Sequence, residues 1–205
     1  MQQHLYKTMH KTQKIGEHWD HVPDHEEWRY CTTCQRTEDM EHIMTGCSAR
    51  AREKIWQLAE AAWPHNHLPW PEITLGTILG CGSITSPREP TQDEGENQQQ
   101  RRNYRGAMRL LQILISESAY LIWVLRCERV IQPRTHSETE IEKRWLRAIN
   151  KRLIDDKITA TKIKHGISHI NLVKRTWEAV LRKDGELPEK WMHNREVLVG
   201  RGVRP

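Results

Sequence analysis

Four residues able to bind a metal lie within 17 positions of one another: Cys31, Cys34, His42 and Cys47. Their spacing is C-x2-C-x7-H-x4-C. Two cysteines separated by two residues can direct both thiolates at one ion through a tight turn, and one histidine with a third cysteine completes the tetrahedral donor set that zinc prefers. Because four protein ligands leave no position for an activated water, we predict one structural zinc ion. The alternative interpretation is a group of unliganded thiols beside a histidine.

A second group of possible ligands, His18, His21 and His25, has spacings of three and four residues. Pro23 argues against a continuous helix that would gather the three rings on one face. We interpret the segment as exposed and histidine-rich, and we predict no second metal site.

Paired acidic residues occur at Asp155 and Asp156, at the end of a helical pattern, and we interpret the pair as solvated helix surface. The sequence offers no convergent carboxylates for two-metal catalysis, no glycine-rich phosphate loop and no nucleophile with a positioned base. The chain is therefore predicted not to be an enzyme.

The charge is unevenly distributed. The chain has 32 Lys and Arg against 27 Asp and Glu, but residues 1–100 have a net charge of −6 and residues 101–205 a net charge of +11. A basic half can neutralise the phosphates of RNA or DNA, and it can equally be an ordinary solvated surface. The predicted nucleic-acid contacts are Arg36, Arg144, Arg147 and Lys151.

Helical elements must position these residues. An amphipathic segment, 48–63, is expected to be capped by Ser48 and ended by Pro64, and 64–82 to form turns or at most two short strands. Three further helices are expected. The first covers 106–131, the second begins at the capping box Ser137–Glu140 and has an apolar stripe, and the third covers 168–183. The stripe of the second helix consists of Ile141, Trp145, Ile149 and Leu153.

The predicted fold is therefore mainly α: a small CCHC zinc-binding unit, a flexible linker and a basic helical bundle. The expected boundaries are an irregular or disordered segment at 1–29, the zinc unit with its following helix and turns at 30–82, the linker at 83–104 and the helical domain at 105–205.

The longest apolar stretch, Leu110 to Leu125, contains Glu117 and is shorter than the about 20 apolar residues that span a bilayer. It is expected to be a buried helix. Since the first 16 residues lack the pattern of a secretory signal, we expect an intracellular protein, in the nucleus or cytoplasm, with no membrane partner.

Taken together, these motifs resemble a known family. The shared features are the Cys-His cluster with Glu41-His42-Ile43, the turn Gly76–Gly80, the segments Ser116–Trp123 and Arg126–Arg129, and the C-terminal Leu187-Pro188 and Val197–Gly200. From about Tyr30 onward the chain resembles the C-terminal region of LINE-type, non-LTR retrotransposon polyproteins of fungal genomes, downstream of their reverse transcriptase and ribonuclease H domains.

The resemblance implies that Cys31, Cys34, His42 and Cys47 are the ligands of a reverse-transcriptase-associated zinc-binding domain, a CCHC zinc knuckle that contacts nucleic acid. It further implies a detached, non-catalytic fragment or remnant whose partners are RNA or DNA and the reverse transcriptase and ribonuclease H domains of the same element. The alternative is a zinc-stabilised helical scaffold that docks on protein through Trp63, Trp70 and Trp191 and does not contact nucleic acid.

Overall fold

Helices dominate the computed structural model, which describes residues 2–64, 69–83, 97–162, 167–181 and 187–200. The α-helices in these ranges are α1 (Gln2–Met9), α2 (Arg50–Ala62), α3 (Leu75–Leu79), α4 (Asn97–Ile131), α5 (Glu138–Lys162) and α6 (Ile167–Leu181). They contain no β-strand, only an isolated antiparallel bridge between Tyr30 and Thr37. The prediction of a mainly α fold, with a Cys-His cluster near the N-terminus and helices after it, is confirmed.

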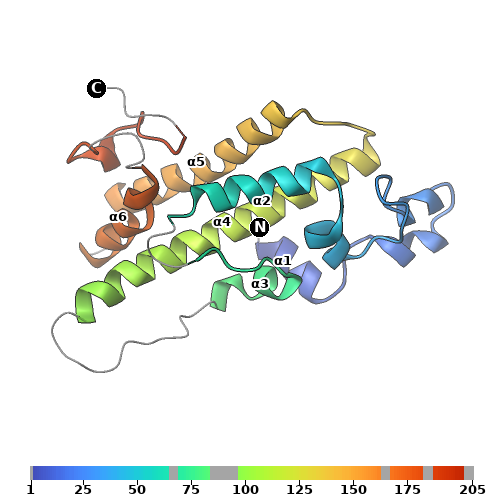
Figure 1. Ribbon diagram of the computed structural model, residues 1–205, viewed down its shortest axis with the longest axis horizontal. Coiled ribbons are helices and arrows are strands. Elements are labelled where there is room, and N and C mark those ends of the chain that lie inside the picture. Colours follow the sequence, from blue (N-terminus) through green and yellow to red (C-terminus); the bar gives the residue numbers. More distant parts are fainter. Residues whose placement is uncertain (1, 65–68, 84–96, 163–166, 182–186, 201–205) are drawn as a thin grey trace. The chain divides into compact units, whose positions relative to one another are not determined.

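Short helical turns join these elements. Four 3₁₀ turns, η1 (Gly16–His21), η2 (Glu26–Arg29), η4 (Cys81–Ser83) and η6 (Trp191–His193), and one π-helical turn, η3 (His42–Gly46), occur in the described ranges. Figure 1 shows α4 as one continuous helix, coloured from green to yellow.

The chain divides into two compact units that do not follow its sequence order. Unit 1 comprises Met1–Glu60, Pro71–Gly82 and Ile115–Trp145, and unit 2 comprises Ala61–Trp70, Ser83–Leu114 and Leu146–Pro205. Helices α2, α4 and α5 each contribute residues to both units. The expected boundary between 82 and 83 coincides with a change of unit, whereas the expected boundaries at 30 and 105 do not.

Tryptophan side chains connect the elements of unit 1, and two of their indole N–H groups donate buried hydrogen bonds. The Nε1 of Trp56 in α2 donates to the Met44 carbonyl at 2.9 Å, and the Nε1 of Trp145 in α5 donates to the Ser118 hydroxyl of α4 at 2.9 Å. His4 of α1 packs its ring against the ring of Trp123, with centroids 5.2 Å apart. These contacts fix the elements that surround the Cys-His cluster.

Unit 2 is a bundle of helical segments from α4, α5 and α6. Asp156 of α5 is 6% exposed and accepts hydrogen bonds from both Nη atoms of Arg109, at 2.6 and 2.7 Å, and from the Trp177 indole at 2.8 Å. The expectation that Asp156 is solvated was wrong, because it is the polar link between three helices, whereas Asp155 is exposed and pairs with Lys151.

The start and the stripe of α5 match the sequence pattern. The Ser137 hydroxyl accepts from the Glu140 backbone N–H at 3.2 Å, as an N-cap does. The Glu140 carboxylate pairs with Arg134 and with His136. The predicted stripe of Ile141, Trp145, Ile149 and Leu153 is at most 2% exposed.

Other boundaries differ from expectation. Helix α4 begins at Asn97, so the predicted linker was wrong over 97–104, and 84–96 lies outside the described residues. The segment 97–104 is too polar for a core, but Gln and Arg are good helix formers and extend the apolar helix that follows. Helix α6 ends at Leu181, and the predicted end at Lys183 is outside the described ranges.

Three local predictions near the N-terminal half were also wrong. Helix α2 starts at Arg50, so Ser48 is not the residue directly before it. Residues 75–79, expected to form turns or strands, form helix α3, and the Thr74 hydroxyl caps it by accepting from Thr77 N–H at 3.0 Å. The segment expected to be irregular contains α1, η1 and η2. Helix α1 is anchored by the burial of His4 against α4, a tertiary contact that leaves no sequence period.

Helix α4 is long and apolar enough, by length and composition, to cross a membrane. In the fold, however, 67% of its most apolar 18-residue window is buried inside the protein. The sequence-based interpretation of this segment as a core helix matches that burial.

Candidate metal centre

The first two cysteines lie in a tight turn at the tip of a minimal hairpin. Cys31 N–H donates to the Arg36 carbonyl and Gln35 N–H donates to the Cys31 carbonyl, both at 2.8 Å. Gln35 has a φ of +54°, the left-handed conformation that lets the chain reverse directly after Cys34. The turn therefore holds both sulfur atoms on one side of the hairpin.

The other two residues lie at opposite ends of a widened helical turn. The Asp39 carboxylate accepts from His42 N–H at 2.6 Å and so fixes the start of this turn. From His42 to Gly46 the backbone follows π-helical geometry, and Cys47 N–H donates to the His42 carbonyl at 2.6 Å. Such turns often occur at functional sites because they displace side chains from the regular α-helical positions.

These elements bring the four side chains to one point. The candidate ligand atoms of Cys31, Cys34, His42 and Cys47 all lie within 4.8 Å of one another. The Cys47 Sγ is 3.6 Å from the Cys31 Sγ and 3.8 Å from the Cys34 Sγ. Among the residues that the structure describes, this is the one group of three or more Cys, His, Asp or Glu side chains close enough to hold a metal ion.

The His42 ring gives independent support for a metal. His42 is 3% exposed, and both its ring nitrogens are buried without a hydrogen-bond partner. An unsatisfied buried polar group is costly and rare in folded proteins. Burial lowers the pKa of His42, which keeps the ring in the neutral form that a metal ligand requires.

Hydrogen-bond donors surround the sulfur atoms. Ser48 N–H donates to the Cys34 Sγ at 3.4 Å, the Ser48 hydroxyl lies 3.1 Å from it, and Ala49 N–H donates to the Cys47 Sγ at 3.4 Å. The contacts with Ser48 lower the pKa of Cys34 to about 7, whereas burial raises the pKa of Cys47 to about 11. Cys47 therefore needs a nearby cation to become a thiolate.

A buried ion-pair network, which sequence analysis missed, supports the cluster from α4. Glu38 is 2% exposed and pairs with Arg126, whose Nε donates to it at 2.7 Å, and its other oxygen lies 3.7 Å from the Nη2 of Arg129. The Nη2 of Arg129 also lies 3.9 Å from the Cys31 Sγ. Arg126 and Arg129 lie in the last turns of α4, but nothing in the sequence pairs them with Glu38, which precedes Arg126 by 88 residues.

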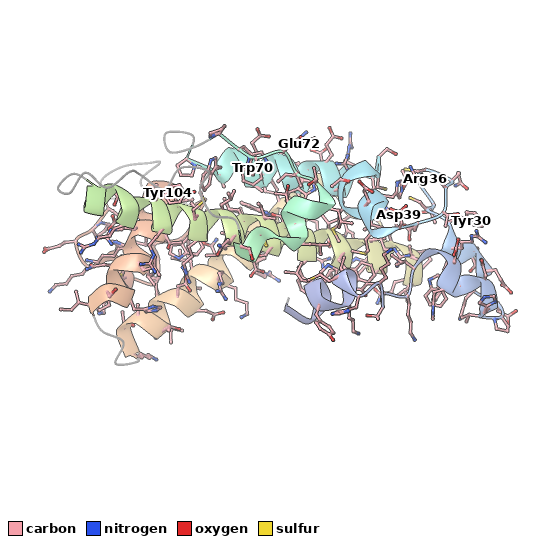
Figure 2. All side chains as sticks on the ribbon, turned by 90° about the horizontal axis from the view of Figure 1, so that it is seen from below. Tyr30, Arg36, Asp39, Trp70, Glu72 and Tyr104 are labelled. Carbon is pink, nitrogen blue, oxygen red and sulfur yellow. The ribbon has the colours of Figure 1, made fainter. Side chains whose placement is uncertain are left out.

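The four predicted nucleic-acid contacts do not fall in one unit. Arg36 and Arg144 belong to unit 1, and Arg147 and Lys151 belong to unit 2. Arg36 lies on the cysteine turn, and its side chain is 61% exposed. Its Nη2 is 3.8 Å from the Oδ2 of Asp39, and both residues are labelled in Figure 2. Arg147 and Lys151 are exposed.

Arg144, one of the four predicted nucleic-acid contacts, is not freely exposed as Arg147 and Lys151 are. Its side chain is 24% exposed, and its two Nη atoms donate to the two carboxylate oxygens of Glu128 at 2.6 and 2.7 Å. A guanidinium group engaged in this way is part of the packing between α4 and α5. Its exposure was overestimated because helical periodicity locates a face but does not identify a partner on the neighbouring helix.

The tryptophans expected at a docking surface are mostly internal. Trp63 is 1% exposed and Trp191 is 2% exposed. Trp70 packs against Trp63, with ring centroids 6.4 Å apart.

His18, His21 and His25 form the group for which no second metal site was predicted. Of these, His25 stacks on Trp28, with ring centroids 4.2 Å apart.

A scan against protein-family models and searches of the curated proteins and of the solved structures found no match to this chain.

Proposed function

We propose that Cys31, Cys34, His42 and Cys47 hold one zinc ion whose role is structural. Two sulfurs bound to tetrahedral zinc at about 2.3 Å stand about 3.8 Å apart, close to the 3.6 and 3.8 Å between Cys47 and the two other cysteines. Three thiolates and one imidazole suit zinc better than harder cations. Since four protein ligands complete the tetrahedron, the ion would stabilise the fold and activate no water.

We further propose that the zinc-loaded chain is a non-catalytic accessory module that binds RNA or DNA. The observation that carries this proposal is a zinc-type donor set whose turn exposes Arg36, in a chain with a net charge of +11 over residues 101–205. The resemblance to the zinc-binding region of retrotransposon polyproteins supplies the candidate partners: nucleic acid, and the reverse transcriptase and ribonuclease H domains of such an element. A protein-docking scaffold has less support, because two of its three tryptophans are buried.

Metal content tests the first proposal. The purified, reduced chain is expected to contain one equivalent of zinc by mass spectrometry, and Cys34→Ser is expected to lose it. Cys127→Ser, which removes a cysteine outside the cluster, serves as the matched control and should retain the metal. A wild-type chain that folds without binding zinc would refute the proposal.

Measurements of nucleic-acid binding test the second proposal. Anisotropy of labelled single-stranded RNA and DNA, titrated with zinc-loaded chain across a range of salt concentrations, should show binding that weakens as salt rises. Combined Arg36→Gln, Arg147→Gln and Lys151→Gln should weaken binding, whereas a control with equal charge loss at exposed Lys7, Lys14 and Lys190 should retain more of it. Absence of binding at low salt refutes the proposal.

A further inference from the structure

Unit 1 contains a cavity of about 200 Å³ beside the metal centre. Its walls come from the Cys-His region (Thr33, Ile43 and Cys47), the first turn of α2, the C-terminal part of α4 and residues 134–136. The ionisable side chains that line it, apart from Cys47, are all basic or histidine: Arg50, Arg52, Arg126, Arg129, Arg134 and His136. No aspartate or glutamate lines this cavity.

The arginines of this cavity outnumber the carboxylates that pair with them. Arg50 pairs with Glu138 at 3.2 Å, Arg134 pairs with Glu140 at 2.7 Å, and Arg126 and Arg129 share Glu38. Arg52 donates to the uncharged backbone carbonyl of Cys47. Five guanidinium groups thus meet three carboxylates, and a zinc centre with three thiolates would contribute a net charge of −1, so a positive excess remains.

The backbone adds to this excess. Residues 49–52, which line the cavity, lie at the N-terminus of a 13-residue helix, whose dipole favours an anion there. His136, whose side chain is 4% exposed, lies 2.9 Å from Glu128 and 3.1 Å from Glu140, so these two acids hold the ring at the cavity wall.

The cavity is accessible and large enough for a polyatomic anion. The side chains of Arg50 and Arg134 are 81% and 52% exposed, whereas that of Arg126 is 5% exposed. A single water needs only about 10–15 Å³ of such volume. Ile43, Ile122 and Leu125 provide an apolar part of the wall, against which a non-polar portion of the ligand could pack.

We propose that this cavity is a binding site for a phosphate group. Guanidinium groups bind phosphate oxygens in pairs of parallel hydrogen bonds, and the tetrahedral group can accept from several arginines at once. The phosphate comes either from a nucleic-acid strand or from a free phosphate compound. The inference that the phosphate belongs to a nucleic-acid strand rests on the proposed function above.

The test uses the zinc-loaded full chain and the double variant Arg50→Gln with Arg134→Gln, whose exposed side chains can be changed with little effect on packing. Inorganic phosphate is titrated while the amide and arginine N–H resonances are followed by NMR, and labelled single-stranded RNA and DNA are titrated by anisotropy. The matched control is Lys14→Gln with Lys143→Gln, which removes the same charge from exposed positions of unit 1 outside the cavity.

We expect phosphate to shift resonances of 49–52 and of the cavity arginines in the wild type and in the control, and at least tenfold weaker binding in the cavity variant. If a strand is the source, the affinity of the cavity variant for the strand falls about tenfold, and its salt slope decreases by about 0.7 for each strand phosphate that the variant no longer neutralises. Phosphate binding with no strand binding confirms the site, assigns it to a free phosphate compound and refutes the proposed function. Strand binding that the cavity variant and the control weaken equally, with no phosphate shift at 49–52, overturns the inference.

Discussion

At the residue scale, the candidate metal centre depends on groups that no motif describes. The cluster of four candidate ligands was predictable, because their types and spacing match tetrahedral coordination. Arg129 and Glu38 were not, since their roles arise only when α4 packs beside the cysteine turn. Likewise, Arg144, predicted to be a nucleic-acid contact, is engaged by Glu128 because α5 packs against α4.

Arg129 is expected to tune the affinity for the metal. Its guanidinium lies 3.9 Å from the Cys31 sulfur and offsets the negative charge of a centre with three thiolates. Substitutions of residues that hold or neutralise ligands typically cost 10- to 100-fold in metal affinity. We expect Arg129→Met to weaken zinc binding by about that factor in a chelator competition assay, while Arg147→Met has no effect. Equal affinities would show that the contact has no electrostatic role.

Glu38 is expected to be essential for the stability of unit 1. Glu38→Gln leaves Arg126, 5% exposed, as a buried charge without its partner, and such a change typically costs about 3–5 kcal/mol. Urea unfolding of the zinc-loaded chain measures this cost. The double variant Glu38→Gln with Arg126→Met should recover part of it, because it removes the stranded charge. A single variant within about 1 kcal/mol of wild type would contradict this account.

At the element scale, long periodic segments were predictable and close helix contacts were not. The stripe of α5 follows from four-residue steps of apolar side chains, and each of its members is buried. Helix α1 was not predicted, because its attachment depends on His4 meeting aromatic rings of α4. The length of α4 was underestimated because residues 97–104 are polar, so helix propensity was the only sequence signal for this part of the helix.

The docking of α1 should weaken in acid. Burial, and then the nearby N-terminal amine, lower the pKa of His4 from 6.5 to about 4. Between these values the unfolded chain binds a proton that the folded chain does not, so stability contributed by the neutral ring is present above pH 6.5 and is lost as pH falls towards 4. Unfolding free energies measured over this range should fall less steeply for His4→Leu than for wild type. Parallel curves would exclude His4 as a contributor.

Gly106 should not tolerate alanine although it lies inside a helix. Alanine is favoured over glycine there by about 1 kcal/mol, but a Cβ at this position would stand 2.6 Å from the Cβ of Arg175 in α6. Overpacking of this kind typically costs about 1–3 kcal/mol. Thermal unfolding is therefore expected to show Gly106→Ala destabilised and Gly82→Ala, where a Cβ meets no atom within 4 Å, nearly unchanged. A stabilised Gly106→Ala would mean that α6 can move away freely.

At the scale of the whole molecule, the order of the longer helices was readable from the sequence but the grouping of the elements was not. The change in composition near residue 83 suggested a boundary between an N-terminal and a C-terminal domain. The contacts instead assign the second half of α4 to unit 1 and its first half to unit 2. Composition indicates which segments are buried, whereas the grouping of elements into units depends on contacts between residues far apart in the chain.

A fragment of residues 105–205 should therefore not fold as the sequence suggests. It lacks the elements before residue 83 that complete unit 1 around Ile115–Trp145. We expect this fragment to be helical by circular dichroism but to unfold over a broader temperature range than the full chain, and to aggregate more readily. A sharp, reversible transition at the temperature of the full chain would show that the fragment is self-sufficient.

The pairing of Glu38 with Arg126 spans 88 residues, and this separation bears on the chain during its synthesis. At about 5–20 residues per second, the ribosome needs roughly 4–18 s to add the second partner after the first. Cys31, Cys34, His42 and Cys47 have all been translated by residue 47, so a metal ion that they bind could be captured while Glu38 still lacks its guanidinium partner. On the proposed function, metal uptake would then precede the tertiary contact, and the loaded turn would be the surface on which α4 assembles.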